Sequence, residues 1–231
     1  MGNINIIIPP YLTQILHAKL GNIDIDSYWD KFYKEIVGNK YQTIPSQFAI
    51  FAINELITLK INDLTEYGCG AGKDAIFFSL NGINVTAYDK SLSAIKHAKM
   101  RSESLSNTPK FIHITDFNDI KQPKRTKNHN ICIYTRFFLH ALDDSLIKSF
   151  FHYLNNTCIK GDIFMSEFRI IGDNDGQKET SDHFRNYINP SEFINILESS
   201  NFKVLYSIKG TGMAKFKRDD ALVMRIIAKM H

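Results

Sequence analysis

The sequence predicts an α/β fold in which a seven-stranded, mostly parallel sheet carries helices on both faces. Between residues 61 and 199, short runs of apolar and β-branched residues alternate with segments of helical periodicity. Such alternation is typical of parallel strands joined by helical crossovers, which bury both faces of a sheet. The last two strand-like runs follow each other with no helix between them, and this predicts an antiparallel C-terminal hairpin at one edge.

Two helices are expected before the first strand. The first begins at Ser27, has its aromatic residues on one face and ends at Gly38. Pro45 and Ser46 open the second, because proline suits a first turn. The elements that follow are strand 61–67, helix 73–80, strand 83–88, helix 92–105, strand 110–114, strand 130–134, helix 144–155, strand 162–168, helix 190–199, and strands 202–208 and 221–228.

Length and composition fit one soluble, cytoplasmic protein. We expect residues 1–60 to form a helical cap segment and residues 61–231 one compact unit, since 44% hydrophobic and 23% charged residues are ordinary for a globular chain. The three cysteines form no C-x-x-C pair, so neither a disulfide framework nor a metal site is expected.

Neither a membrane nor a nucleic acid is an expected partner. The apolar patch at 4–10 is too short to span a membrane. A net charge of +4 is too small to indicate nucleic acid, and the basic run 121–127 has no aromatic residue to stack on bases.

An acid and three alternating glycines interrupt the pattern at the end of the first strand. Residues 66–74 read EYGCGAGKD, which predicts a strand that turns into a helix over a bare backbone. A P-loop would need Ser or Thr after Lys73, but Asp74 stands there. The dinucleotide fingerprint G-x-G-x-x-G also fails, because the third glycine comes one position early and Asp74 puts negative charge where a pyrophosphate would bind.

Acids also follow the next two strands. Asp89 comes about 20 residues after the loop, where a carboxylate can accept hydrogen bonds from both hydroxyls of a ribose. Asp116 follows the third strand, and taken alone it fits a helix N-cap or turn equally well. Together the three positions mark the carboxyl edge of the sheet, where open α/β sheets bind ligands.

The motif E-x-G-C-G-x-G-x-D resembles the first motif of class I S-adenosylmethionine-dependent methyltransferases, in the branch that acts on small molecules. The resemblance covers the chain from about Ser27 onward and implies a Rossmann-like fold with S-adenosyl-L-methionine as cofactor. It implies that Asp116 and Phe117 contact the adenine. The segments YWDKFY and PSQFA resemble a cap that closes over the cofactor, which would bring Tyr28 and Tyr33 to the methionine end, with plain helix packing as the alternative. The expected cofactor-binding residues are Tyr28, Tyr33, Glu66, Gly68, Cys69, Gly70, Gly72, Asp74, Asp89, Lys90, Asp116, Phe117 and Tyr134.

The residues that align the acceptor are expected beyond the fourth and fifth strands, because the cofactor itself brings the reactive methyl group. Arg136 breaks an apolar context just past the fourth strand, and His140 is the candidate general base, with a structural histidine as the alternative. Glu167 ends the fifth strand as a third catalytic candidate, although it could simply pair with an arginine. The expected acceptor-binding residues are Arg136, Arg169, His183, Arg185 and Tyr187.

The last three of these lie in a segment that resembles the acceptor lid of small-molecule members, although a plain surface connection is the alternative. Guanidinium groups suit carboxylates and phosphates, so the arginines favour an anionic acceptor. The expected protein is thus a monomeric or homodimeric methyltransferase that modifies oxygen on a small molecule, for instance a phosphate-type or sugar acceptor of cell-surface glycan biosynthesis. The alternatives are a sugar amino N-methyltransferase and a binding protein without turnover. A nucleic-acid methyltransferase is disfavoured, because the N/D-P-P-Y/F word that base N-methylating enzymes often carry is absent after the fourth strand.

Overall fold

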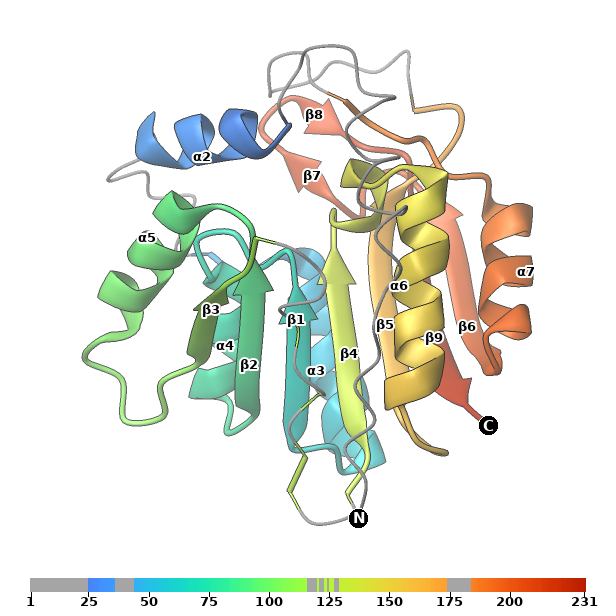
Figure 1. Cartoon of the computed structure of the whole chain (residues 1–231), viewed down its shortest axis with the longest axis horizontal. Coiled ribbons are helices and arrows are strands. Elements are labelled where there is room, and N and C mark those ends of the chain that lie inside the picture. Colours follow the sequence, from blue (N-terminus) through green and yellow to red (C-terminus); the bar gives the residue numbers. More distant parts are fainter. Residues whose placement is uncertain are drawn as a thin grey trace.

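The computed structural model describes residues 25–35, 44–115, 120, 123, 125–126, 129–173 and 184–231. Its centre is a seven-stranded sheet in the order β3-β2-β1-β4-β5-β9-β6 (Figure 1). The strands are β1 Asp63–Tyr67, β2 Asn84–Asp89, β3 Lys110–His113, β4 Ile131–Arg136, β5 Ile163–Arg169, β6 Phe202–Gly210 and β9 Val223–Met230. The helices are α2 Ile25–Glu35, α3 Gln47–Leu59, α4 Lys73–Leu80, α5 Leu92–Ser102, α6 Asp144–Thr157, α7 Pro190–Ser199 and the short 3₁₀ helix η3 Leu139–Ala141.

The strand pairing confirms the predicted fold class. Strands β1 to β5 pair in parallel, whereas β9 pairs antiparallel with both β5 and β6. Strand β9 therefore lies inside the sheet and β6 forms the edge, which explains why β9 is buried along almost its whole length. A small hairpin of β7 Lys215–Phe216 and β8 Asp219–Asp220 interrupts the connection between them, and no sequence pattern had predicted it.

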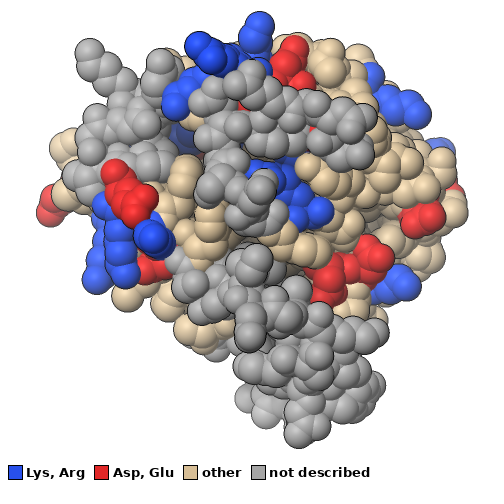
Figure 2. Space-filling model, turned by 90° about the horizontal axis from the view of Figure 1, so that it is seen from above, with Lys and Arg blue, Asp and Glu red and all other residues tan. Residues whose placement is uncertain are grey.

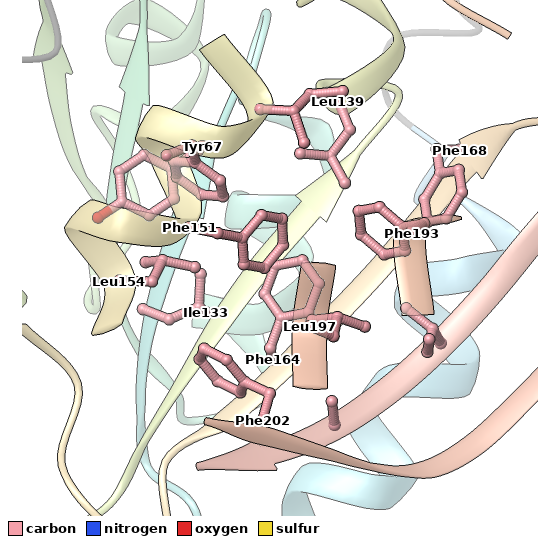
Figure 3. Close-up of a cluster of buried hydrophobic side chains, with 14 of the residues drawn as sticks. Tyr67, Ile133, Leu139, Phe151, Leu154, Phe164, Phe168, Phe193, Leu197 and Phe202 are labelled. Atoms are coloured by element: carbon pink, nitrogen blue, oxygen red, sulfur yellow. The ribbon is translucent and has the colours of Figure 1, made fainter. Parts of the chain in front are cut away.

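Each face of the sheet packs against its own helices, because side chains alternate between the faces along a strand. Helices α6 and α7 cover one face with an aromatic cluster that includes Phe151, Phe164 and Phe193 (Figure 3). Helices α3, α4 and α5 cover the other face, where Phe48 and Phe78 pack around Tyr134. Burying each of these phenylalanines contributes roughly 1.5–3 kcal/mol.

Helix α3 differs slightly from the prediction at its start. It begins at Gln47, and Ser46 is its N-cap, with the hydroxyl accepting a hydrogen bond from the Ala49 amide at 3.0 Å. Pro45 thus precedes the cap rather than occupying the first turn. The division of the chain at residue 60 stays a prediction. Among the helices that the structure describes, none is both long and apolar enough to cross a membrane.

Candidate active site

The glycine loop lies at the carboxyl edge of the sheet, between β1 and α4 (Figure 1). Gly68, Gly70 and Gly72 all have left-handed backbones, with φ of 74°, 54° and 74°. Other residues adopt such angles only at a cost, so the loop shape depends on glycine. The Gly68 amide donates to the Tyr88 carbonyl at 2.9 Å, which ties the loop to the end of β2.

Asp89, at the end of β2, faces this loop. One carboxylate oxygen accepts the Gly70 amide at 2.7 Å, and the other accepts the Ser91 amide at 2.8 Å. These bonds hold the carboxylate in place beside the loop, and a carboxylate oxygen can accept more than one hydrogen bond, as from a ribose. The next residue, Lys90, is exposed, and its carbonyl contacts the His113 ring at 3.0 Å.

Helix α2 covers the middle glycine with Tyr33. A Cβ added to Gly70 would lie only 2.1 Å from the Tyr33 hydroxyl oxygen. Burial, and then the negative charge of Asp89, raise the pKa of this hydroxyl, so it stays a neutral donor and acceptor. Asp30 anchors the helix by accepting hydrogen bonds from the Ser91 hydroxyl at 3.1 Å and the Ser93 amide at 2.9 Å. Tyr28, on the same helix, packs against Trp29 with ring centroids 5.1 Å apart.

Glu66, at the end of β1, carries a buried polar atom that no described residue satisfies. Its side chain is 3% exposed, and its Oε2 has no hydrogen-bond partner in the part of the chain that the structure describes. Burial is the main cause of a raised pKa for this carboxyl, and the carboxylates of Asp74 and Asp89 raise it further. An unpaired buried carboxyl is costly, and a cation placed beside it would remove the cost. The amino group of an amino-acid-bearing cofactor fits this requirement.

Asp74 and Tyr134, both predicted to bind the cofactor, also bind the start of α3. The Asp74 carboxylate accepts the Ser46 amide and the Ser46 hydroxyl, each at 2.7 Å, and the Tyr134 hydroxyl at 3.1 Å. These bonds join α3, α4 and β4 below the loop.

Cys69 is buried in the loop itself. Burial, and then the negative charges of Asp89 and Glu66, raise the pKa of its thiol well above the ordinary value. It therefore lines the site as a neutral thiol and not as a nucleophile.

A row of three charged side chains crosses the ends of β4, β5 and β9. Arg136 pairs in register with Glu167, and Glu167 with Arg225. The fully buried Glu167 accepts the Arg136 Nε at 2.9 Å on one oxygen and the Arg225 Nε at 2.7 Å on the other. The row therefore carries one surplus positive charge. Arg225 was not predicted, although it is the single charge in the apolar run ALVMRIIA and could have been noticed there.

Phe137 follows β4 in an unusual backbone conformation. Its φ is 54°, a left-handed value that costs a residue with a side chain on the order of 1 kcal/mol or more. The turn places its ring 4.4 Å from the guanidinium carbon of Arg136 and 5.4 Å from that of Arg169. The ring of the buried His140 packs edge-on against it at 5.1 Å. The structure thus brings Arg136 and His140 together around one aromatic ring. Their roles at the acceptor site stay a prediction.

Arg169 lies near this ring but is engaged elsewhere. Its two terminal nitrogens bind Asp173 and Asp219, each at 2.5 Å. The side chain is also buried, so the structure gives this arginine a role in holding β5 to the β7–β8 hairpin. Arg136 keeps both of its terminal nitrogens without a hydrogen bond to any described residue, and its side chain is 16% exposed.

The segment after residue 183 reaches the same edge. The Asn186 amide donates to the His140 carbonyl at 2.7 Å, so its neighbours Arg185 and Tyr187 flank η3. His183, Asp116 and Phe117 lie outside the described residues. Seen from above, one group of Lys and Arg side chains is visible near the centre of this face, and others lie around its rim (Figure 2). The described residues include no group of His, Cys, Asp and Glu that could hold a metal ion.

Comparison with known proteins identifies the family. A family model described as a methyltransferase domain matches residues 53–207, which is more than half of the chain. No protein in the curated set matches the chain in sequence. Among solved structures, an S-adenosylmethionine-dependent methyltransferase from Anabaena variabilis has a TM-score of 0.62 and 14% identity, covering 91% of this chain and 96% of its own.

Two further structures contain ligands. Magnesium protoporphyrin IX methyltransferase from Synechocystis, with bound SAH, has a TM-score of 0.61 and 12% identity, covering 96% of this chain and 94% of its own. A glycopeptide N-methyltransferase complexed with sinefungin has a TM-score of 0.61 and 14% identity, covering 80% and 87%. At these identities the similarity establishes the fold. Together with the family match, it shows that the chain belongs to the methyltransferase-domain family and has the class I fold of S-adenosylmethionine-dependent methyltransferases, as the glycine motif predicts.

Proposed function

We propose that the protein binds S-adenosyl-L-methionine and transfers its methyl group to a small-molecule acceptor, at oxygen. The observation that carries the proposal is the unpartnered, buried Oε2 of Glu66 beside a glycine loop held to Asp89. A cofactor with a ribose and an amino group supplies a partner for each carboxylate. Structural neighbours bound to S-adenosylmethionine, SAH or sinefungin support the same choice.

The residues that would hold the cofactor follow from the geometry. Asp89 would accept from the ribose, Glu66 would face the amino group, and Tyr33 would close over Gly70 and exclude water. Gly68 and Gly70 let Phe138 and Tyr33 pack directly against the loop, because a Cβ at either position would meet one of these side chains within about 3 Å. When bound, the cofactor supplies an electrophilic methyl group on a sulfonium. The protein contributes alignment and a dry site.

Arg136 is the proposed acceptor-binding residue. Its guanidinium is fixed through Nε by Glu167, which leaves two terminal nitrogens for an acceptor oxygen at the edge of the site. Such planar, paired donors favour a carboxylate or phosphate. An anionic oxygen has no proton to lose, so His140 would orient the acceptor rather than act as a base. Glu167 has both oxygens occupied by arginines, and we propose that it positions Arg136 and transfers no proton.

Methylation of a sugar amine by the same architecture is the second candidate. The similarity to a glycopeptide N-methyltransferase favours keeping it. Incubation with isotope-labelled S-adenosylmethionine and small-molecule extracts from bacteria tests the proposal. A labelled methyl ester or methyl ether supports methyl transfer to oxygen, and a labelled N-methyl amine supports transfer to nitrogen. Binding of the cofactor without transfer to any compound would indicate a binding protein and would contradict the proposal.

A further inference from the structure

The chain turns sharply where β4 ends and brings two adjacent phenylalanines against different parts of the site. Phe137 has the left-handed backbone described above, and its amide donates to the Glu167 carbonyl at 2.9 Å. Phe138 then packs against the glycine loop, since a Cβ added to Gly68 would lie 2.9 Å from its ring. A left-handed backbone is unfavourable for a large side chain, and such outliers persist where the surroundings impose them, often at functional sites. The turn therefore keeps an unfavourable conformation, and this conformation places the Phe137 ring beside Arg136.

The Phe137 ring is a second restraint on the Arg136 guanidinium. Glu167 holds this group at one point, the Nε, at 2.9 Å. A single hydrogen bond fixes the orientation of a guanidinium less than a bidentate pair does. The ring lies 4.4 Å from the guanidinium carbon, within the distance at which an aromatic face attracts a cation. The two contacts together set both the place and the tilt of the terminal nitrogens.

The β7–β8 hairpin, at the carboxyl edge of the sheet, contacts both the ring and the charged row (Figure 1). Arg169, whose guanidinium carbon is 5.4 Å from the ring, forms an ion pair with Asp219 of the hairpin. The Met213 carbonyl accepts a hydrogen bond from the Arg225 Nη2 at 2.6 Å. Phe137 itself packs against a small buried cluster at the base of the hairpin, formed by Ala214, Ala221 and Val223. The hairpin therefore supports the ring that restrains the guanidinium.

We propose that Phe137 is a positioning residue for methyl transfer, which fixes the Arg136 guanidinium so that its two terminal nitrogens face the acceptor oxygen. This inference rests on the proposed function, in which Arg136 binds the acceptor. It assigns a role to an uncharged residue and to the β7–β8 hairpin that supports it. The physical reason is alignment, because a planar pair of donors matches a carboxylate or phosphate only in the right plane, and a small displacement of the acceptor lowers the rate steeply.

Two variants separate the ring from the volume that it fills. Phe137→Leu removes the aromatic face and keeps an apolar side chain against the hairpin cluster. Phe137→Tyr keeps the ring, and because Phe137 is partly exposed we expect the added hydroxyl to be accommodated. The matched control is Phe77→Leu, which makes the same change at another partly buried ring, on α4, where it packs against Phe78 with ring centroids 5.8 Å apart.

Three measurements on the full chain report on function, folding and geometry. Methyl transfer from isotope-labelled S-adenosylmethionine is followed over a dilution series of one bacterial small-molecule extract, which gives a maximal rate and a half-saturating amount of extract. Calorimetry with S-adenosylhomocysteine gives the affinity and the fraction of competent protein. NMR measures the solvent exchange of the Arg136 Nε–H, with the Arg225 Nε–H, which also binds Glu167, as the internal reference.

Phe137→Leu should raise the half-saturating amount of extract and the exchange rate of the Arg136 Nε–H, each by at least about fivefold, the size of one lost cation–π contact. Exchange at Arg225 and affinity for S-adenosylhomocysteine should stay at their wild-type values. Phe137→Tyr should restore both of the altered quantities.

A purely structural role gives a different result. Damaged folding would lower the maximal rate and the stoichiometry of S-adenosylhomocysteine together and leave the half-saturating amount unchanged, and that result overturns the inference. A Phe137→Leu protein that matches the Phe77→Leu control in transfer or in Arg136 exchange overturns it as well, and so does a Phe137→Tyr protein that restores neither quantity. A wild-type protein that labels no compound contradicts the proposed function instead, and exchange at Arg136 then decides by itself whether Phe137 positions the guanidinium.

Discussion

Replacing Gly70 by alanine tests whether the glycine loop and Tyr33 together form the cofactor site. Two costs are expected. The left-handed backbone, with φ of 54°, costs any residue with a Cβ about 1–2 kcal/mol. The new methyl group would also lie 2.1 Å from the Tyr33 hydroxyl oxygen and 2.9 Å from Cζ of the same ring. The Tyr33 hydroxyl would therefore have to withdraw by about 1.4 Å or more to reach an ordinary contact of about 3.5 Å.

Gly82→Ala provides the matched control. Gly82 also has a left-handed backbone, with φ of 85°, but an added Cβ there would meet nothing within 4 Å. The backbone cost should lower the unfolding free energy of both variants in urea by about 1–2 kcal/mol, and Gly70→Ala should lose more because Tyr33 must also move. Only Gly70→Ala should also lose affinity for S-adenosylhomocysteine, by at least about tenfold, which corresponds to roughly 1.4 kcal/mol. Calorimetry measures this difference.

A second change sharpens the test. Adding Tyr33→Phe to Gly70→Ala removes the oxygen at 2.1 Å and leaves the closest remaining contact at 2.9 Å, so part of the affinity should return. If Gly70→Ala and Gly82→Ala bind S-adenosylhomocysteine equally well, the loop and Tyr33 do not enclose the cofactor. The reasoning from the glycine geometry would then be refuted.

Three further predictions concern stability. The pKa of Glu66 is raised in the folded state, so the folded protein holds this proton more tightly than the unfolded chain, and the unfolding free energy should fall as pH rises above the unfolded value of 4.5. Glu66→Gln should remove this part of the fall when urea denaturation is measured at a series of pH values. An unchanged slope of unfolding free energy against pH would contradict the assignment. Glu167→Gln leaves the buried Arg225 and the partly buried Arg136 without their shared carboxylate and should cost about 3–5 kcal/mol. Arg225→Met leaves the pair of Arg136 and Glu167 intact and should cost less. The reverse order in urea denaturation would show that the row is not organised around Glu167. Ser46→Ala removes the α3 cap and a donor to Asp74 and should cost about 1–2 kcal/mol, which thermal unfolding would detect; no change would mean that these bonds contribute little.

The fold was predictable because its signals are local. Strand and helix periodicities, the left-handed glycines and the position of Asp89 all depend on residues near each other in the sequence. The pairing of β9 with β6 was predicted, but its pairing with β5 was not, since nothing in an apolar run says which strand will lie on its other side. That choice depends on packing across the whole sheet.

The charged part of the site shows the same limit. Arg225 meets Glu167 from 58 positions away, and Arg169 meets Asp219 from 50 positions away. Residue type alone made Arg169 look like an acceptor-binding group, whereas Asp173, four residues away, and the distant Asp219 engage both of its terminal nitrogens. The Glu167–Arg225 pair follows from strand register, and the Arg169–Asp219 pair joins β5 to the separate β7–β8 hairpin. The sequence pattern leaves both open.

The most direct test of the central claim is the affinity of the wild-type protein and of Asp89→Ala for S-adenosylhomocysteine, measured by calorimetry with the Gly82→Ala protein as a folded control. The wild type and Gly82→Ala should bind one equivalent, because the carboxylate of Asp89 is fixed by the Gly70 and Ser91 amides where it can accept from a ribose. Asp89→Ala should bind at least about a hundredfold more weakly, since it loses charge-assisted bonds to the ribose hydroxyls. Equal affinity in wild type and Asp89→Ala, or no binding by the wild type, would contradict the account.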